Sequence, residues 1–130
     1  MQASGEFEVT LEPLDSYALG SEGINLSRMS IRKTFRGDLE GKSHGEMLSV
    51  TTSIQGSAGY VAIEQVEGIL LGKSGTFVLQ HFGIMSHGEN QLILEVVPDS
   101  GTGQLVSLSG KMTFIIEDSQ HMYEFDYSLG

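Results

Sequence analysis

The sequence contains no cysteine and no tryptophan, and only two of its 130 residues are proline. Without cysteine, the chain can form no disulfide, no thiolate nucleophile and no cysteine-ligated zinc or iron–sulfur centre. A chain of this length can nevertheless bury a sufficient hydrophobic core. We therefore expect residues 1–130 to form one domain that folds without covalent or metal cross-links.

Basic residues are also scarce. Seven Lys and Arg stand against seventeen Asp and Glu, which gives a formal charge of −10. Such a charge repels nucleic-acid phosphates and anionic membranes, so neither is an expected partner. No apolar run is long enough to span a bilayer, and residues 1–9 lack a basic segment followed by an apolar one. We expect a cytoplasmic protein.

Glycine, in contrast, is frequent, with 17 residues, about twice the usual share of roughly 7%. The glycines interrupt stretches in which apolar and polar residues alternate, as they do in strands with one buried face. No stretch has the periodicity of a long amphipathic helix. Short turns join the strands, which predicts an all-β fold, an eight-stranded antiparallel meander closed into a barrel. The expected strands cover residues 6–12, 28–35, 39–54, 60–71, 76–85, 91–97, 111–117 and 121–129.

The fourth and fifth of these strands form a long predicted hairpin. If residues 73–74 make a two-residue turn, Val66 pairs with His81 and Glu64 pairs with Gly83. Glu64 and His81 then share one face. We assign this face to the barrel interior because it mixes bulky side chains with gaps left by Gly and Ala. Its other members are Tyr60, Ala62, Gly68, Leu70, Phe77, Leu79 and Met85.

The opposite face of the same hairpin is apolar along most of its length. A strand face in contact with water is usually polar, so a face this apolar requires a cover. The chain has no spare helix to supply one, and a second copy of the same subunit is the expected cover. We therefore predict a homodimer. The residues of this face are Val61, Ile63, Ile69, Leu71, Val78, Phe82 and Ile84.

Five stretches of the chain resemble a bacterial family known only as a domain of unknown function. They are GDLEGKSHGEML, GSAGYVAIE, SGTFVLQH, VVPDSGTGQL and HMYEFDYSL. The resemblance covers nearly the whole chain. That family is similar in fold to allene oxide cyclase, an eight-stranded antiparallel meander barrel related in shape to the lipocalins. The resemblance implies the same barrel, while the binding of an apolar substrate inside it is an analogy of fold alone.

Glu64 and His81 are the candidate catalytic residues. A carboxyl group among Ala62, Phe77 and Leu79 loses its water. This favours the protonated form and moves the pKa towards the range useful for acid–base catalysis. A neighbouring imidazolium acts in the opposite direction. The alternative interpretation is a structural polar pair, since such pairs also have perturbed pKa values.

Other inward residues are candidates for contact with a ligand. Glu46 is expected either as a second inward carboxylate or as a solvated strand residue. Tyrosine hydroxyls can orient a ligand, although aromatic residues at period two are also typical of a plain core. The candidate ligand-binding residues are Tyr60, Ala62, Phe77, Leu79, Met85, Glu46, Tyr123 and Tyr127.

No metal or other cofactor is expected. His81 and His87 are six strand positions apart, roughly 20 Å at the usual rise per residue, which is too far for one ion. Three functions remain open. The first is a barrel that binds a small apolar or amphipathic molecule in its interior. The second is a cofactor-free isomerase, cyclase or lyase with Glu64 and His81 as its acid–base pair. The third is a structural dimer with a filled core.

Overall fold

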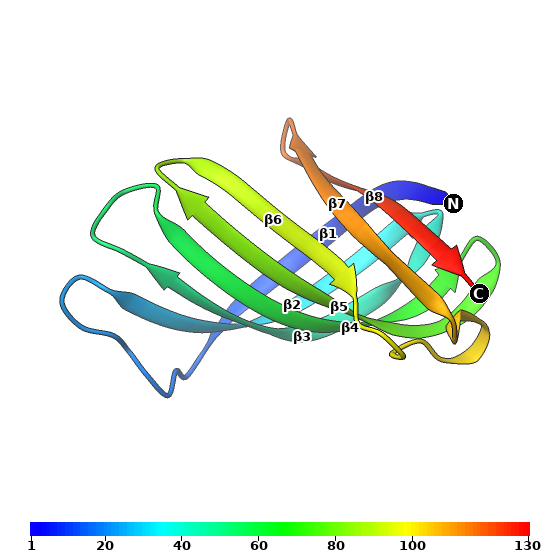
Figure 1. Cartoon of the computed structure of the whole chain (residues 1–130), viewed down its shortest axis with the longest axis horizontal. Helices are drawn as coiled ribbons and strands as arrows, with labels where there is room; N and C mark the ends of the chain where they lie inside the picture. Colours follow the sequence, from blue (N-terminus) through cyan, green and yellow to red (C-terminus); the bar gives the residue numbers. More distant parts are fainter.

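The computed structural model describes all 130 residues and shows eight antiparallel strands in a closed barrel (Figure 1). Each strand pairs with the next one in the sequence, and β8 pairs with β1. The predicted all-β meander barrel is therefore confirmed. The strands are β1 Gln2–Leu14, β2 Asn25–Gly37, β3 Leu39–Thr51, β4 Ala58–Leu70, β5 Lys73–Ser86, β6 Glu89–Val96, β7 Leu108–Glu117 and β8 Gln120–Leu129.

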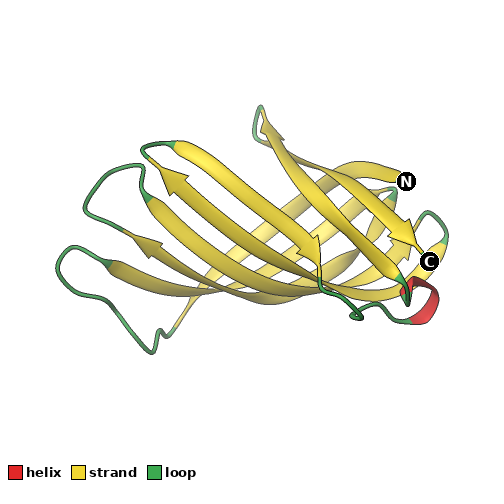
Figure 2. Ribbon diagram, in the orientation of Figure 1, coloured by secondary structure: helices red, strands yellow, loops and turns green.

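The only helical segment is one short turn of 3-10 helix, Gly103–Leu105, at one end of the barrel (Figure 2). None of the helical structure is long and apolar enough to cross a membrane. We call the end that carries this turn the closed end. The opposite end, with the β1–β2, β3–β4, β5–β6 and β7–β8 loops, is the open end (Figure 1).

The central hairpin turns two residues earlier than predicted. Leu71 and Gly72 form the two-residue turn with φ angles of 46° and 87°. Turns with two positive φ angles match the twist of a hairpin, so the conformational freedom of Gly72 determines the register. Glu64 therefore pairs with Leu79 instead of Gly83. Because the loop moves by an even number of residues, the predicted inward and outward faces are unchanged.

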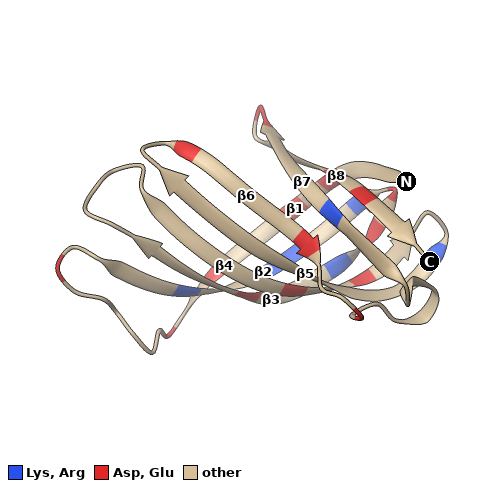
Figure 3. Ribbon diagram, viewed as in Figure 1, with Lys and Arg blue, Asp and Glu red and all other residues tan.

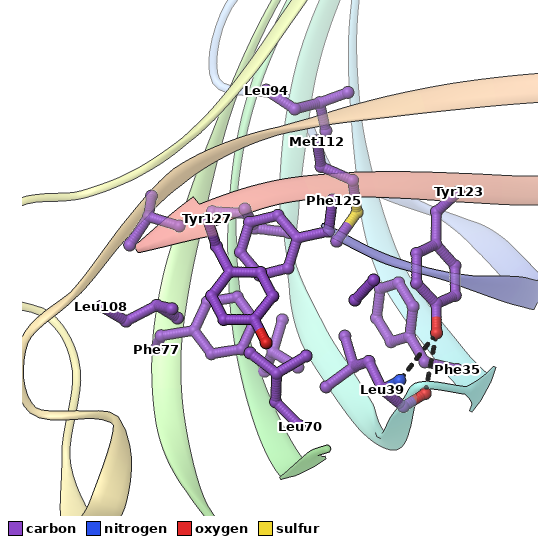
Figure 4. Close-up of a cluster of buried hydrophobic side chains, with 14 of the residues drawn as sticks. Phe35, Leu39, Leu70, Phe77, Leu94, Leu108, Met112, Tyr123, Phe125 and Tyr127 are labelled. Carbon is purple, nitrogen blue, oxygen red and sulfur yellow. Dashed lines mark hydrogen bonds between the residues drawn. The ribbon is translucent and has the colours of Figure 1, made fainter. Parts of the chain in front are cut away.

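The closed end is filled by a hydrophobic cluster of 16 buried residues (Figure 4). The hydroxyl of Tyr123 ties this cluster to the backbone. It accepts a hydrogen bond from the Leu39 N–H at 2.9 Å and donates one to the Arg36 carbonyl at 2.9 Å. Leu105 of the 3-10 turn is completely buried and packs into the closed end of the barrel. None of these 16 residues lines the cavity at the other end of the barrel.

The seam between β6 and β7 is the shortest in the barrel. These strands pair at only two positions, Leu94 with Met112 and Glu95 with Lys111. Every other pair of neighbours has at least the six paired positions of β1 with β8. Towards the open end, β6 and β7 diverge from each other (Figure 1). The wall of the barrel is therefore split along this edge.

Candidate functional site

A cavity of about 640 Å³ occupies the open end of the barrel. Met47, Tyr60 and Met85, from β3, β4 and β5, form one wall, and Leu92 and Phe114 extend it to the split seam. None of the residues that line the cavity has a charged side chain. Polar atoms come from Tyr60 and, in addition, from Ser49, Thr51, Asn90 and Gln91.

Three ionisable side chains lie buried beneath the cavity. They are Lys33 of β2, Glu64 of β4 and His81 of β5, with exposed side-chain fractions of 4%, 0% and 3%. The Glu64 Oε2 atom lies 3.0 Å from Lys33 Nζ and 3.4 Å from His81 Nε2. The hypothesis that Glu64 and His81 meet inside the barrel is consistent with this geometry. Their role in catalysis stays a prediction.

The acid and the lysine come from strands on either side of β3, which has a glycine beside Glu64. Lys33 and Glu64 stand on β2 and β4, with β3 between them. Gly45 of β3 pairs with Glu64, and a methyl group added to it would lie 2.6 Å from the Glu64 Cα atom. The missing side chain therefore allows the backbones of β3 and β4 to approach each other closely beside Glu64. On the other side of β4, His81 is placed by its pairing with Ala62.

Burial and the neighbouring charges shift the pKa values of Glu64 and Lys33. Burial acts to raise the pKa of the Glu64 carboxyl, but His81 and Lys33 act in the opposite direction and prevail, so the pKa lies below its usual value. The neighbouring charges therefore favour the ionised carboxylate, which is the second of the two opposing effects expected from the sequence. Burial also lowers the pKa of Lys33, while Glu64 partly opposes this effect.

Several polar atoms of the cluster are buried without a hydrogen-bond partner in the protein. They are Ser43 Oγ, Glu64 Oε2 and His81 Nε2. Ser43 stands opposite Lys33 on the neighbouring strand. An unpaired buried polar atom costs about 1–3 kcal/mol of stability. Glu64 Oε2 nevertheless lies 3.0 Å from Lys33 Nζ and 3.4 Å from His81 Nε2, so ion pairing offsets this cost for both atoms. No group of three or more His, Asp or Glu side chains is arranged to hold a metal.

Tyr60 connects the buried cluster with the cavity. It lines the cavity, and its hydroxyl lies 3.5 Å from His81 Nδ1. Its ring covers Gly83, where any side chain would collide with it. Burial, with a further contribution from the charge of Glu64, raises the pKa of Tyr60. The hydroxyl is therefore neutral and can both donate and accept a hydrogen bond to a ligand.

The structure separates the predicted ligand-binding residues into groups. Tyr60 and Met85 line the cavity. Ala62 is buried beside His81, below the cavity. The remaining apolar candidates belong to the filled cluster at the closed end and do not line the cavity, because their own packing occupies the space there. They are Phe77, Leu79, Tyr123 and Tyr127.

Glu46 is the candidate that the structure contradicts most clearly. It lies on the outer face of β3, where its carboxylate pairs with the guanidinium of Arg28. The side chains of this pair are 55% and 40% exposed. Met47, the next residue, faces the cavity, so the alternation of the strand turns Glu46 outwards. The expectation of a second inward carboxylate is wrong.

Two residues of the site were absent from the predicted set. Lys33 has Ile31 and Phe35 as neighbours on its face of β2, and all three are buried. This alternation was a usable signal, because a lysine on an apolar face requires a buried partner. Phe114 lines the cavity and lies 4.3 Å, measured from its ring centroid, from Lys33 Nζ. Nothing in the sequence distinguishes it from a core aromatic residue.

Fold and site together define a small antiparallel β-barrel with an uncharged cavity above a buried polar cluster. Residues 3–127 match a family described as protein of unknown function (DUF3224), and the chain belongs to this family. The chain is similar to a DUF3224 protein of unknown function from Shewanella oneidensis MR-1 whose crystal structure is known. The two sequences are 55% identical, and the two structures superpose with a TM-score of 0.98. The match covers 100% of this chain and 97% of that chain.

No curated protein matches the chain. The predicted likeness to the allene oxide cyclase barrel stays a prediction, because the similar structure is itself a DUF3224 protein. The predicted cytoplasmic location also stays a prediction.

Proposed function

We propose that the protein binds a small apolar or amphipathic molecule in the cavity at the open end of its barrel. The cavity carries this proposal, since its volume of about 640 Å³ lies within the range of roughly 300–1,000 Å³ that is typical of small-molecule sites. Its lining is mainly apolar, with a few polar groups that can orient a ligand.

The composition of the walls supports this function. Met47 and Met85 lie on the β3–β5 side of the cavity. Methionine side chains are flexible and polarisable, so they adapt to the shape of an apolar guest. The split between β6 and β7 supplies a lateral entrance, because Leu92 and Phe114 belong both to the diverging strands and to the cavity lining.

Binding can be tested with N-phenyl-1-naphthylamine, an uncharged dye whose fluorescence rises in apolar surroundings. We expect saturable binding of one dye per chain. Ala58 lines the cavity, so the larger side chain of Ala58→Phe should fill part of it and abolish binding. Ser109→Phe places the same side chain on the outer face of β7 and should leave binding unchanged. Absence of binding to the wild type, or equal binding to Ala58→Phe, would contradict the proposal.

A second candidate function is general acid catalysis, and the contact series from the cavity inwards favours it. The Tyr60 hydroxyl lies 3.5 Å from His81 Nδ1, and His81 Nε2 lies 3.4 Å from Glu64 Oε2. In this arrangement Tyr60 donates a proton to a substrate carbonyl oxygen, and His81 replaces that proton while Glu64 stabilises the imidazolium. Glu64 is fully buried and would act as a positioning residue.

This candidate predicts cofactor-free enolisation of a neutral ketone. The reaction moves a proton from the carbon beside the carbonyl to solvent and a proton onto the carbonyl oxygen. NMR spectroscopy in D2O can follow the exchange of that carbon-bound hydrogen in 2-tetralone. We expect exchange above the buffer rate, which Tyr60→Phe and His81→Gln should remove while the dye still binds. Exchange that is unchanged in both variants would exclude the proposed roles of Tyr60 and His81.

A further inference from the structure

We propose that the cavity selects an uncharged ligand that carries at least one hydrogen-bonding group. This inference rests on the proposed function and adds the chemical class of the ligand. It follows from the position of every charge near the cavity: the charged side chains are either beneath its floor and paired, or outside the barrel.

No cation is available to an acidic ligand. The lining contains neither lysine nor arginine. Lys33 is the one buried cation near the cavity, and its Nζ atom is 3.0 Å from Glu64 Oε2. Phe114 lines the cavity and lies over this ammonium group, 4.3 Å from its ring centroid. A ligand carboxylate would therefore lose its water without gaining a cationic partner, which is unfavourable.

A positively charged group inside the cavity would likewise lose its water without gaining a partner of opposite charge. The lining contains no carboxylate, and Glu64 already faces Lys33 and His81. The surroundings of the entrance add a further barrier to anions, because Glu89 stands next to the lining residue Asn90 and the whole chain has a charge of −10. The lining thus offers a charged partner to neither an anion nor a cation, which favours a neutral molecule.

The polar groups of the cavity define the second part of the proposal. The Tyr60 hydroxyl lies at the inner end, above His81, while the amides of Asn90 and Gln91 lie on β6 at the split seam. All three can donate and accept hydrogen bonds. A neutral molecule with an apolar body and a hydroxyl, amide, amine or carbonyl group satisfies them without leaving a buried charge.

Two dyes with the same ring system test this inference. N-phenyl-1-naphthylamine is neutral, and 1-anilinonaphthalene-8-sulfonate adds one sulfonate to it. We expect the neutral dye to bind at least roughly tenfold more tightly, a difference of about 1.4 kcal/mol. The preference should persist at about 1 M salt, where the Debye length falls to about 3 Å, because it comes from desolvation inside the cavity. Tyr60→Phe should weaken the neutral dye several-fold.

The outcomes separate the inference from the function on which it rests. If neither dye binds, the proposed binding function fails. If the sulfonate binds as tightly as the neutral dye and Ala58→Phe abolishes both, the cavity binds ligands but the proposed selection of uncharged ones is overturned. A preference that disappears at high salt would also overturn it, since the surface charge would then be its cause.

Independently, we infer that the outer face of β3–β6 pairs with a second copy of this chain. Leu48, Val61, Phe82 and Ile93 are direct cross-strand neighbours and form one apolar row over four strands. They are 57%, 49%, 46% and 41% exposed. Ile63 and Ile84 extend the row on either side, and we call these six residues the outer apolar patch.

Charge argues for a second copy as the occupant. The chain carries −10 overall, and β5 has no Asp, Glu, Lys or Arg after Lys73 (Figure 3). Two identical acidic chains repel each other least where this uncharged face meets its equivalent. An isologous dimer also needs only one patch on each subunit, whereas a head-to-tail assembly needs two.

The size of the patch is appropriate for the centre of a dimer interface. Four strands at about 4.8 Å spacing make the apolar row roughly 14 Å wide. Stable interfaces bury roughly 800 Å² on each partner around an apolar centre, with a polar rim. Glu46 and Glu95 flank Ile63 and Gln80 in the adjacent row and supply such a rim.

Analytical ultracentrifugation of the full chain tests this interface. We expect twice the mass of one chain for the wild type and a monomer for Phe82→Glu, which places a carboxylate at the centre of the patch. Ser109→Glu adds the same charge on the outer face of β7 and should remain dimeric. Circular dichroism shows whether each variant is folded. A monomeric wild type at high concentration, or a dimer in folded Phe82→Glu, would overturn the inference.

Discussion

The two ends of the barrel are built from the same strands and have opposite interiors. Along β4, Leu70 and Val66 are buried in the closed-end cluster, Glu64 lies at the boundary, and Tyr60 lines the cavity. Along β7, Met112 is 3% exposed in the core and Ile116 is 65% exposed at the cavity. One end of the barrel is therefore packed with side chains, while the other holds the cavity.

The connection between β6 and β7 explains much of this contrast. After Val96 the chain folds back onto β5, where Val97 N–H bonds to the Val78 carbonyl at 2.9 Å and Thr102 N–H bonds to the Thr76 carbonyl at 2.8 Å. This connection brings Leu105 into the closed end. At the open end β6 and β7 have no pairing, so nothing draws their side chains together.

The largest expected effect concerns the polar boundary between the two ends. Lys33→Met leaves the Glu64 carboxylate buried and without its cation, which should destabilise the protein by about 3–5 kcal/mol. Urea unfolding measures the change. The double variant Lys33→Met/Glu64→Leu removes both charges and should recover most of the loss. A double variant that is less stable than either single variant would show that the ion pair itself stabilises the barrel.

One substitution made at each end tests the contrast directly. Met112→Ala removes a side chain from the filled cluster and should cost about 2–5 kcal/mol. Met85→Ala removes the same side chain from the cavity wall, where no packing is lost across the open space, and should cost less than about 1 kcal/mol. Equal losses in urea unfolding would mean that the open end is packed as tightly as the closed end.

A smaller effect should appear in the dependence of stability on pH. The pKa of Glu64 is lowered in the folded state. A lowered carboxyl pKa contributes stability that is present above the unfolded-state pKa of about 4.3, and this contribution disappears as the pH falls through the folded-state pKa. As the pH falls below about 5, Glu64→Gln should therefore lose less stability than the wild type.

The control for this measurement is an acid outside the barrel. Glu124 is exposed on β8, so Glu124→Gln should keep the pH dependence of the wild type. If Glu64→Gln and the wild type instead lose stability in parallel at acid pH, Glu64 does not have a lowered pKa in the folded protein, and the account of the buried cluster is contradicted.

Alternation predicted the barrel and its inward face from the sequence, because a strand places every second residue on one side. It also placed Glu64 and His81 on that face. The assignment of the two faces remained correct although the hairpin turn lies at Leu71 and Gly72. Alternation left Glu46 undecided, because Met47 and Leu48 are both apolar and so do not show which residues of β3 face inwards.

Alternation cannot distinguish the filled end of the barrel from the open one. Phe77 and Tyr127 have the same inward pattern as Tyr60, yet only Tyr60 reaches the cavity. Two features determine which inward residues reach the cavity, and neither is visible in the local sequence pattern. They are the connection that brings Leu105 under the core and the short pairing of β6 with β7. The partnership of Lys33 with Glu64 across β3 likewise depends on tertiary contact.

The methyl groups of methionine offer the most direct test of the central claim. Met47 and Met85 line the cavity, and Met112 lies in the closed-end cluster. Protein labelled with carbon-13 at the methionine methyl groups can be titrated with N-phenyl-1-naphthylamine and followed by NMR. We expect the signals of Met47 and Met85 to shift with saturation while that of Met112 stays in place. A shift of Met112 alone, or no shift in any of the three, would contradict a ligand cavity confined to the open end.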